Sequence, residues 1–256
     1  LVWYDRAEEL DPGEAFSLLD TVHFMPFDKL SEEELGKIAK FALIESQSGE
    51  PDVRIASWRA FKLLTAYQPE HPCCAEIGMC VRAAQVEDNI TMTFLKYRVL
   101  NNLGEDTARE QELLYDRDVV SDIFLDNLKT ATPWVIKSAN IKLLVDQIAH
   151  GKQEHMLHIA AHLSNLVKVS EHVIVRHDAG TALLRIIGLL TPDQRNEIVV
   201  ELMKGLEVGE YEFSKYIPQY LGQAALWLPP EQLEEIVSYL HGMMANANDQ
   251  IVSVAL

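Results

Sequence analysis

The sequence predicts an all-α chain in which a pair of helices repeats about every 40 residues. Helix-breaking residues are scarce, because the 256 residues include only 12 glycines and 10 prolines, fewer than in average usage. One nine-residue segment occurs three times without gaps, and pairs of an apolar and a basic residue recur at spacings of 42, 41 and 39 residues. A repeat of this length made of two helices is typical of an α-solenoid, in which each repeat packs on the next.

Apolar residues recur with helical spacing in twelve segments. Prolines lie between these segments, where a missing backbone N–H costs least. Pro218 is the exception, because it falls inside a predicted helix, and we expect a kink there. The first helices of the successive pairs are 12–24, 51–67, 89–103, 133–149, 172–189 and 210–227, and the second helices are 31–46, 72–86, 106–129, 152–168, 192–206 and 230–245.

The repeated nine-residue segment opens three of the second helices. Leu30–Ile38 aligns with Leu190–Ile198 and with Leu228–Ile236. Each copy has a leucine, a helix cap, an acidic first turn that suits the helix dipole, and an isoleucine that we expect to be buried. Ser31 and Glu34 have the spacing of a capping box.

The pairs of an apolar and a basic residue open the first helices. They are Val53-Arg54, Leu95-Lys96, Ile136-Lys137 and Val175-Arg176. Two further steps of 38 residues lead to Phe213 and Ile251, which also begin apolar segments. We therefore predict six helix pairs and part of a seventh, wound into a right-handed superhelix.

Two of the first helices resemble those of a known family. Residues 51–64 read Pro-Asp-Val-Arg-Ile-Ala-Ser-Trp-Arg-Ala-Phe-Lys-Leu-Leu, and residues 175–186 are similar in the same register. This pattern resembles the first helix of a HEAT repeat, and the resemblance extends from about residue 11 to the end of the chain. It implies a HEAT- or armadillo-like solenoid in which small residues let adjacent helices approach. We expect the apolar positions of these two helices to be buried: Val53, Ala56, Ala60, Leu64, Val175, Ala179, Ala182, Leu183 and Ile186.

The charge balance restricts the kinds of partner that we expect this chain to bind. The formal net charge is −17, from 22 Lys and Arg against 39 Asp and Glu. We expect no nucleic-acid partner, because phosphate binding needs a basic surface, and no binding to anionic lipid. No apolar stretch approaches the ~18 residues of a membrane span. Three cysteines cannot form a disulfide framework, which favours a reducing, cytoplasmic location.

The common enzyme signatures are missing from the sequence. No two glycines lie within three residues of each other, which excludes the dinucleotide-binding fingerprint. The nucleophile elbow is missing too, because the one glycine pair with its spacing, Gly205 and Gly209, encloses Glu207 instead of a serine. No glycine is followed by Lys-Ser or Lys-Thr, and His-Glu-x-x-His does not occur. We therefore predict a chain that is not an enzyme and that binds no cofactor.

A group of histidines is the most conspicuous candidate site. His155, His158 and His162 fall within an arc of ~60° on one predicted helix, and Asn165 extends that polar edge. The three interpretations are a metal site, a pH-sensitive surface that faces a ligand, and a plain solvated flank. Because no carboxylate has ligand spacing on the same arc, we predict no metal and name these four residues as binding candidates.

A second cluster contains all the cysteines. Cys73, Cys74 and Cys80 lie with His71 at the opening of one predicted helix, and Cys73 shares a face with Cys80. Structural zinc needs four ligands at spacings nearer Cys-x₂-Cys. A role as small core residues competes with a structural or redox role.

Taken together, the residues predict one HEAT-like solenoid domain over 1–256. Residues 1–10 form an N-terminal extension, 248–256 begin a further repeat, and we expect the chain to be a piece of a longer protein. The predicted function is a non-catalytic scaffold or regulatory module, whose second helices line an acidic concave groove for a protein or basic peptide. Two alternatives are an accessory domain of a multidomain enzyme and a His-centred metal-dependent enzyme.

Overall fold

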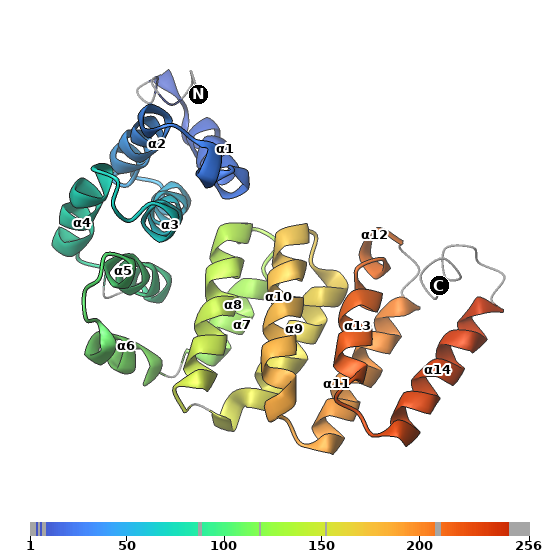
Figure 1. The fold of residues 1–256 in the computed structure, drawn as a ribbon. Coiled ribbons are helices and arrows are strands. Elements are labelled where there is room, and N and C mark those ends of the chain that lie inside the picture. Colours follow the sequence, from blue (N-terminus) through green and yellow to red (C-terminus); the bar gives the residue numbers. More distant parts are fainter. Residues whose placement is uncertain are drawn as a thin grey trace. The chain divides into compact units, whose positions relative to one another are not determined.

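The chain is helical throughout the part that the structure, a computed structural model, describes (Figure 1). That part comprises residues 4, 6, 9–86, 89–117, 119–151, 153–207 and 211–245, without the side chains of Tyr211 and Phe213. These residues contain no β-strand, which confirms the all-α class. None of their helices is both long and apolar enough to cross a membrane.

The chain divides into two compact units. One unit contains residues 1–117 and 130–139, and the other contains 118–129 and 140–256. The division falls within one helix, α8 (Trp134–Ala149). A single domain over 1–256 stays a prediction, and its proposed ends at 1–10 and 248–256 lie largely or wholly outside the described residues.

In the first unit, first helices and second helices of the predicted pairs alternate along the chain. Its first helices α1, α3 and α5 pack on one another in succession, and its second helices α2 and α4 also contact each other. The second helices α2 and α4 contact the first helices that follow them, α3 and α5. The helices of this unit are α1 (Pro12–Thr21), α2 (Glu32–Glu45), α3 (Pro51–Tyr67), α4 (Cys73–Ala83), α5 (Ile90–Asn102) and α6 (Ala108–Tyr115), with short 3₁₀ turns at Val22–Phe24 and Phe27–Lys29.

The second unit has the same kind of neighbour packing. The second helix α9 contacts both α10 and α11, and α13 packs on α10 and α11. The Tyr220 ring of α13 lies so close to Gly180 of α10 that a Cβ there would approach it to 2.3 Å, so this crossing needs glycine. Besides the end of α8, this unit contains α7 (Val120–Leu128), α9 (Met156–Val169), α10 (Val173–Ile186), α11 (Pro192–Leu206), α12 (Tyr211–Ser214), α13 (Ile217–Ala225) and α14 (Pro230–Met244), with 3₁₀ turns at Gln153–His155 and Ile187–Leu189.

Two predicted helices are wrong as single elements. The segment 106–129 forms α6 and α7, because the polar residues 116–118 interrupt its apolar periodicity. The segment 210–227 forms α12 and α13, and Pro218 begins a new helix instead of kinking an old one. Pro218 lies in the first turn of α13, where its missing N–H removes no helical hydrogen bond.

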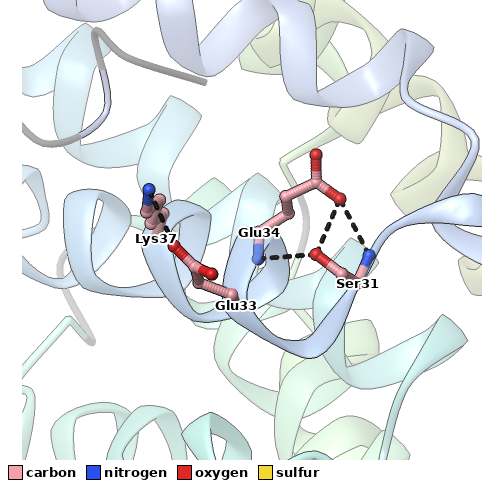
Figure 2. A network of polar contacts seen from close by, with 4 residues as sticks. All are labelled: Ser31, Glu33, Glu34 and Lys37. Carbon is pink, nitrogen blue, oxygen red and sulfur yellow. Dashed lines mark hydrogen bonds and ion pairs between the residues drawn. The ribbon is translucent and has the colours of Figure 1, made fainter.

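The helix starts follow the predicted capping pattern. At Ser31, the Glu34 amide donates to the serine hydroxyl at 3.3 Å, and the Ser31 amide donates to the Glu34 carboxylate at 2.9 Å (Figure 2). Thr191 and Gln194 form the equivalent box at α11. A third box, between Asp11 and Glu14, opens α1.

The basic residues of three of the four repeated pairs fasten a first helix to the end of the second helix before it. Arg54 donates from Nη1 to the carbonyls of Ser48 at 2.6 Å and Gly49 at 2.9 Å, just after α2. The Lys96 ammonium donates to the Ala84 carbonyl at 2.7 Å, at the C-cap of α4. The last carbonyls of a helix have no partner within the helix, and the helix C-terminus attracts cations. Each of these contacts therefore gives such a carbonyl a donor and places a positive charge beside it.

Arg176 makes the third of these contacts and is 4% exposed. Its Nε donates to the carbonyl of Ser170, the C-cap of α9, and its Nη1 donates to the Glu212 carbonyl at 2.8 Å. Its guanidinium also lies 5.2 Å from the centre of the Tyr216 ring. Arg176 therefore joins α9, α10 and the segment that contains α12.

All nine residues predicted to be buried are buried, with exposed fractions from 0% to 6%. We expect Leu183→Ala to lower the free energy of unfolding by about 2–5 kcal/mol, because Leu183 is 0% exposed and its truncation leaves a cavity. The matched change Leu113→Ala, at a side chain that is 62% exposed, should cost less than about 0.5 kcal/mol. Chemical denaturation of both variants measures the difference, and a Leu183→Ala cost below about 1 kcal/mol would contradict the assigned core.

We expect Arg176→Ala to lower the free energy of unfolding by about 1–3 kcal/mol, because it removes the donor of the buried Ser170 carbonyl and of the Glu212 carbonyl. Arg185→Ala, at an exposed arginine of the same helix, is the matched control. Equal losses in the two variants would mean that the fastening contact contributes nothing to stability.

Candidate functional site

The four predicted binding residues do not share one exposed surface. His155 precedes α9 and is half-buried, His158 is exposed, and Asn165 is half-buried. His162 is only 8% exposed. The structure thus places His162 in the interior of the second unit, whereas a binding role for the other three stays a prediction.

His162 belongs to a buried network that involves three helices. Its imidazole stacks on the Phe124 ring of α7, with centroids 4.2 Å apart. Asn127 of α7 donates from Nδ2 to His162 Nε2 at 3.4 Å, and Asn127 Oδ1 accepts from Asn140 of α8 at 3.3 Å. With Nε2 as the acceptor, the neutral imidazole carries its proton on Nδ1. This network joins α7, α8 and α9 and engages Nε2 of His162 inside the protein.

Burial lowers the pKa of His162 from 6.5 to about 4, because the interior disfavours the imidazolium. The folded protein therefore keeps His162 neutral between pH 5 and 7. His162 therefore contributes no change of charge to binding in that range.

The cysteine cluster lies at the start of α4 in the first unit. His71 Nδ1 lies 2.8 Å from Cys73 Sγ and also accepts from the Cys73 amide at 3.2 Å. His71 Nε2 lies 3.1 Å from the Glu32 carbonyl, which makes Nε2 the protonated nitrogen. A hydrogen bond between the thiols of Cys73 and Cys74 raises the pKa of Cys73 and lowers that of Cys74.

This histidine geometry has a structural counterpart elsewhere in the chain. His172 Nδ1 accepts from the Ile174 amide at 3.3 Å at the start of α10, as His71 does for Cys73. Both imidazoles thus cap a first turn. All three cysteines are free thiols, and Cys74 donates to the Gln68 carbonyl at 3.2 Å.

Neither cluster assembles a metal centre. Among the described residues, no three His, Cys, Asp or Glu side chains are grouped so that they could hold a metal ion. The histidines in and just before α9 do not form a metal site, because His162 is buried whereas His158 is exposed. The cysteine cluster does not form one, because the thiols of Cys73 and Cys74 are engaged with each other and Cys74 donates to a backbone carbonyl.

Arg59 forms a buried cluster that the sequence analysis did not identify. It is 6% exposed, its Nη2 lies 2.5 Å from His23 Nδ1, and its guanidinium lies 4.1 Å from the centre of the Trp134 ring. The His23 ring meets Trp134 edge-on at 5.2 Å. The sequence signal is an arginine on the apolar side of 51–67. The cluster holds together the turn after α1, the middle of α3 and the start of α8.

A cavity of about 380 Å³ opens in the first unit near the ends of α2 and α4. Trp58 and Met92 line its apolar side, and Arg54, Gln47 and Cys80 line its polar side. Arg54 is held by the Ser48 and Gly49 carbonyls, and the Gln47 amide faces Cys80 Sγ at 3.9 Å. The described residues that line this cavity include neither a histidine nor a carboxylate.

Charge is distributed unequally between the two sets of helices. The second helices (α2, α4, α6, α7, α9, α11 and α14) carry fifteen Asp and Glu but only seven Lys and Arg. The first helices (α1, α3, α5, α8, α10, α12 and α13) carry six acidic and nine basic residues. The acidic excess of the described helices therefore lies on the second helices.

We expect the stability of the protein to fall on acidification because of His162. The unfolded chain, with a pKa of about 6.5, takes up the proton before the folded protein, whose pKa is about 4. The stabilising contribution is complete above pH 6.5 and is lost as the pH falls to 4, by up to about 3 kcal/mol. His162→Gln should flatten this dependence in denaturant titrations, whereas His158→Gln, at an exposed histidine, should retain it. Equal slopes in the two variants would refute the assignment.

No protein-family model matches this chain, and no curated protein matches its sequence. Inferences about its function therefore rest on its own residues and on the packing of its helices.

Proposed function

We propose that this chain is a non-catalytic helical-repeat module that binds a basic protein segment through its second helices. The observation that carries the proposal is the charge difference between the two sets of helices, with fifteen acidic against seven basic residues on the second set. Opposite charge on a partner accelerates association and selects among partners.

The architecture that we propose is a HEAT-like, right-handed superhelix whose second helices line the concave face. Two features support it. In the first unit α3 contacts α1 and α5, and α2 contacts α4, while in the second unit α9 contacts α11 and α10 contacts α13. Helices of the two sets also contact each other, as α2 does α3 and α9 does α10. The basic residues that fasten the helix ends, Arg54, Lys96 and Arg176, recur with the same period of about 40 residues.

Several carboxylates of the second helices are already engaged within the protein. Glu34 is held in the capping box of α2, which lowers its pKa, and Glu33 pairs with Lys37 at 3.1 Å (Figure 2). Glu201 of α11 pairs with both Lys168 and Lys204. The proposal therefore rests on exposed carboxylates outside these networks, among them Glu76 and Glu197.

A fluorescein-labelled, extended Lys-rich peptide tests this function by fluorescence anisotropy. We expect binding that weakens as the ionic strength rises from about 0.01 M to 0.15 M, because the Debye length shrinks from ~30 to ~8 Å. Glu76→Lys and Glu197→Lys, on α4 and α11, should each weaken binding about threefold or more at low salt.

The matched control is Asp52→Lys, which makes the same change of charge at an exposed position of the first helix α3. Asp52→Lys should weaken peptide binding less than either Glu76→Lys or Glu197→Lys does. Binding that is independent of salt, or an equal loss in all three variants, would contradict a binding site on the second helices.

A further inference from the structure

We propose that the cavity near the ends of α2 and α4 binds a small molecule in which a carboxylate is attached to an apolar body. The residues that line it come from the end of α2, the start of α3, the end of α4 and the start of α5, all within the first unit. Arg54 and Trp58 hold the carboxylate, and Met92 and Val86 contact the apolar body. This site takes an anion, whereas the proposed function concerns a basic protein segment.

The cavity has the size and the lining of a small-molecule site. Its volume of about 380 Å³ lies at the lower end of the roughly 300–1,000 Å³ of ligand cavities, which are mainly apolar with a few polar groups. Trp58 and Met92 are 2% and 6% exposed, and Val86 extends the apolar wall that they form. These walls suit an aromatic or branched aliphatic group.

Arg54 is a cation that the fold fixes at this cavity with donors to spare. Its Nη1 donates to the carbonyls of Ser48 at 2.6 Å and Gly49 at 2.9 Å, which holds the guanidinium in place. Its Nε and Nη2 have no hydrogen-bond or ion-pair partner among the described residues. These two nitrogens form one edge of the guanidinium, and such an edge matches the two oxygens of a carboxylate.

The Trp58 indole supplies a second donor without a partner. Its Nε1–H donates to no described residue, although Trp58 is only 2% exposed. Nε1 is also not among the side-chain atoms that are sealed from solvent without a partner, so it keeps contact with open space, and Trp58 lines this cavity. Because a buried indole N–H ordinarily has an acceptor, an acceptor atom of a ligand fits this position.

The two donors belong to one face of one helix. Arg54 and Trp58 are separated by four residues of α3, so their side chains are neighbours on the helix surface and can converge on one carboxylate. Arg54 is also the only charged residue among the described residues that line the cavity. A carboxylate pairs this charge in a partly desolvated place, where such a pair is stronger than in water.

The net charge of −17 does not prevent an anion from binding here. At physiological salt the Debye length is ~8 Å, so exposed carboxylates farther away than that are largely screened. Glu87 and Asp88 follow Val86 in the sequence and lie outside the described residues. They are the competing carboxylates of the chain itself, and the experiment includes them.

The probe is phenylacetate, titrated into the full chain by calorimetry. We expect saturable binding, whereas phenylacetamide, which lacks the charge, and acetate, which lacks the aromatic body, should each bind about tenfold more weakly or worse. Arg54→Gln should weaken the binding of phenylacetate by a similar factor. The matched control Arg109→Gln removes the same charge at an exposed position of α6 that does not line the cavity, and it should leave binding unchanged.

Arg54 also fastens α3 to the end of α2, so a measurement on the unchanged chain accompanies this variant. Heteronuclear NMR resolves the indole N–H signals, and Trp58→Phe and Trp134→Phe identify two of them. Phenylacetate should shift the Trp58 signal. It should leave the signal of Trp134, which is also buried in the first unit but does not line the cavity, in place.

Every other result overturns the proposed site. Equal binding of phenylacetate and phenylacetamide contradicts selection by charge, and equal binding of acetate contradicts the apolar walls. An unmoved Trp58 signal, or an unchanged affinity in Arg54→Gln, places the ligand elsewhere on the chain. If phenylacetate binds only after Glu87→Gln is combined with Asp88→Asn, or does not bind at all, the cavity is not a site for an external carboxylate. None of these outcomes alters the salt-dependent binding of the Lys-rich peptide that tests the proposed function.

Discussion

The packing of each helix against its neighbours in sequence is the constraint on which this structure depends. The apolar residues of α3 and α10, such as Val53, Leu64, Val175 and Leu183, are buried between neighbouring helices. A helix of this length cannot bury such a stripe alone, so its stability comes from the helices on either side.

The uneven distribution of charge follows in part from this packing. Arg54, Lys96 and Arg176 are bound to backbone carbonyls at the ends of preceding helices, and Arg59 is buried against Trp134. Much of the positive charge of the first helices is therefore used inside the fold. Some carboxylates of the second helices are engaged as well, namely Glu33, Glu34 and Glu201. The proposed recognition therefore rests on exposed carboxylates such as Glu76 and Glu197.

Residues with catalytic side chains are used structurally in this chain. His162 packs on Phe124 and accepts from Asn127, and His71 caps the turn that contains Cys73. These contacts engage Nε2 of His162 and both ring nitrogens of His71, which metal binding or general base catalysis would need. This reading agrees with the lack of common enzyme motifs in the sequence and with a function based on surface recognition.

Local sequence patterns predicted most of the helices, because the spacing of apolar residues, the capping boxes and the prolines act within a few turns. They correctly placed α3 and α11, the box at Ser31 and nine buried residues of α3 and α10. They could not place His162 in the interior, because Phe124, which covers it, comes from another helix. They could not separate α6 from α7, or reveal that Val237 is open where the equivalent Val199 is closed. Each of these features depends on which distant segment covers a given flank, and a helical period defines a face without identifying the helix that packs on it.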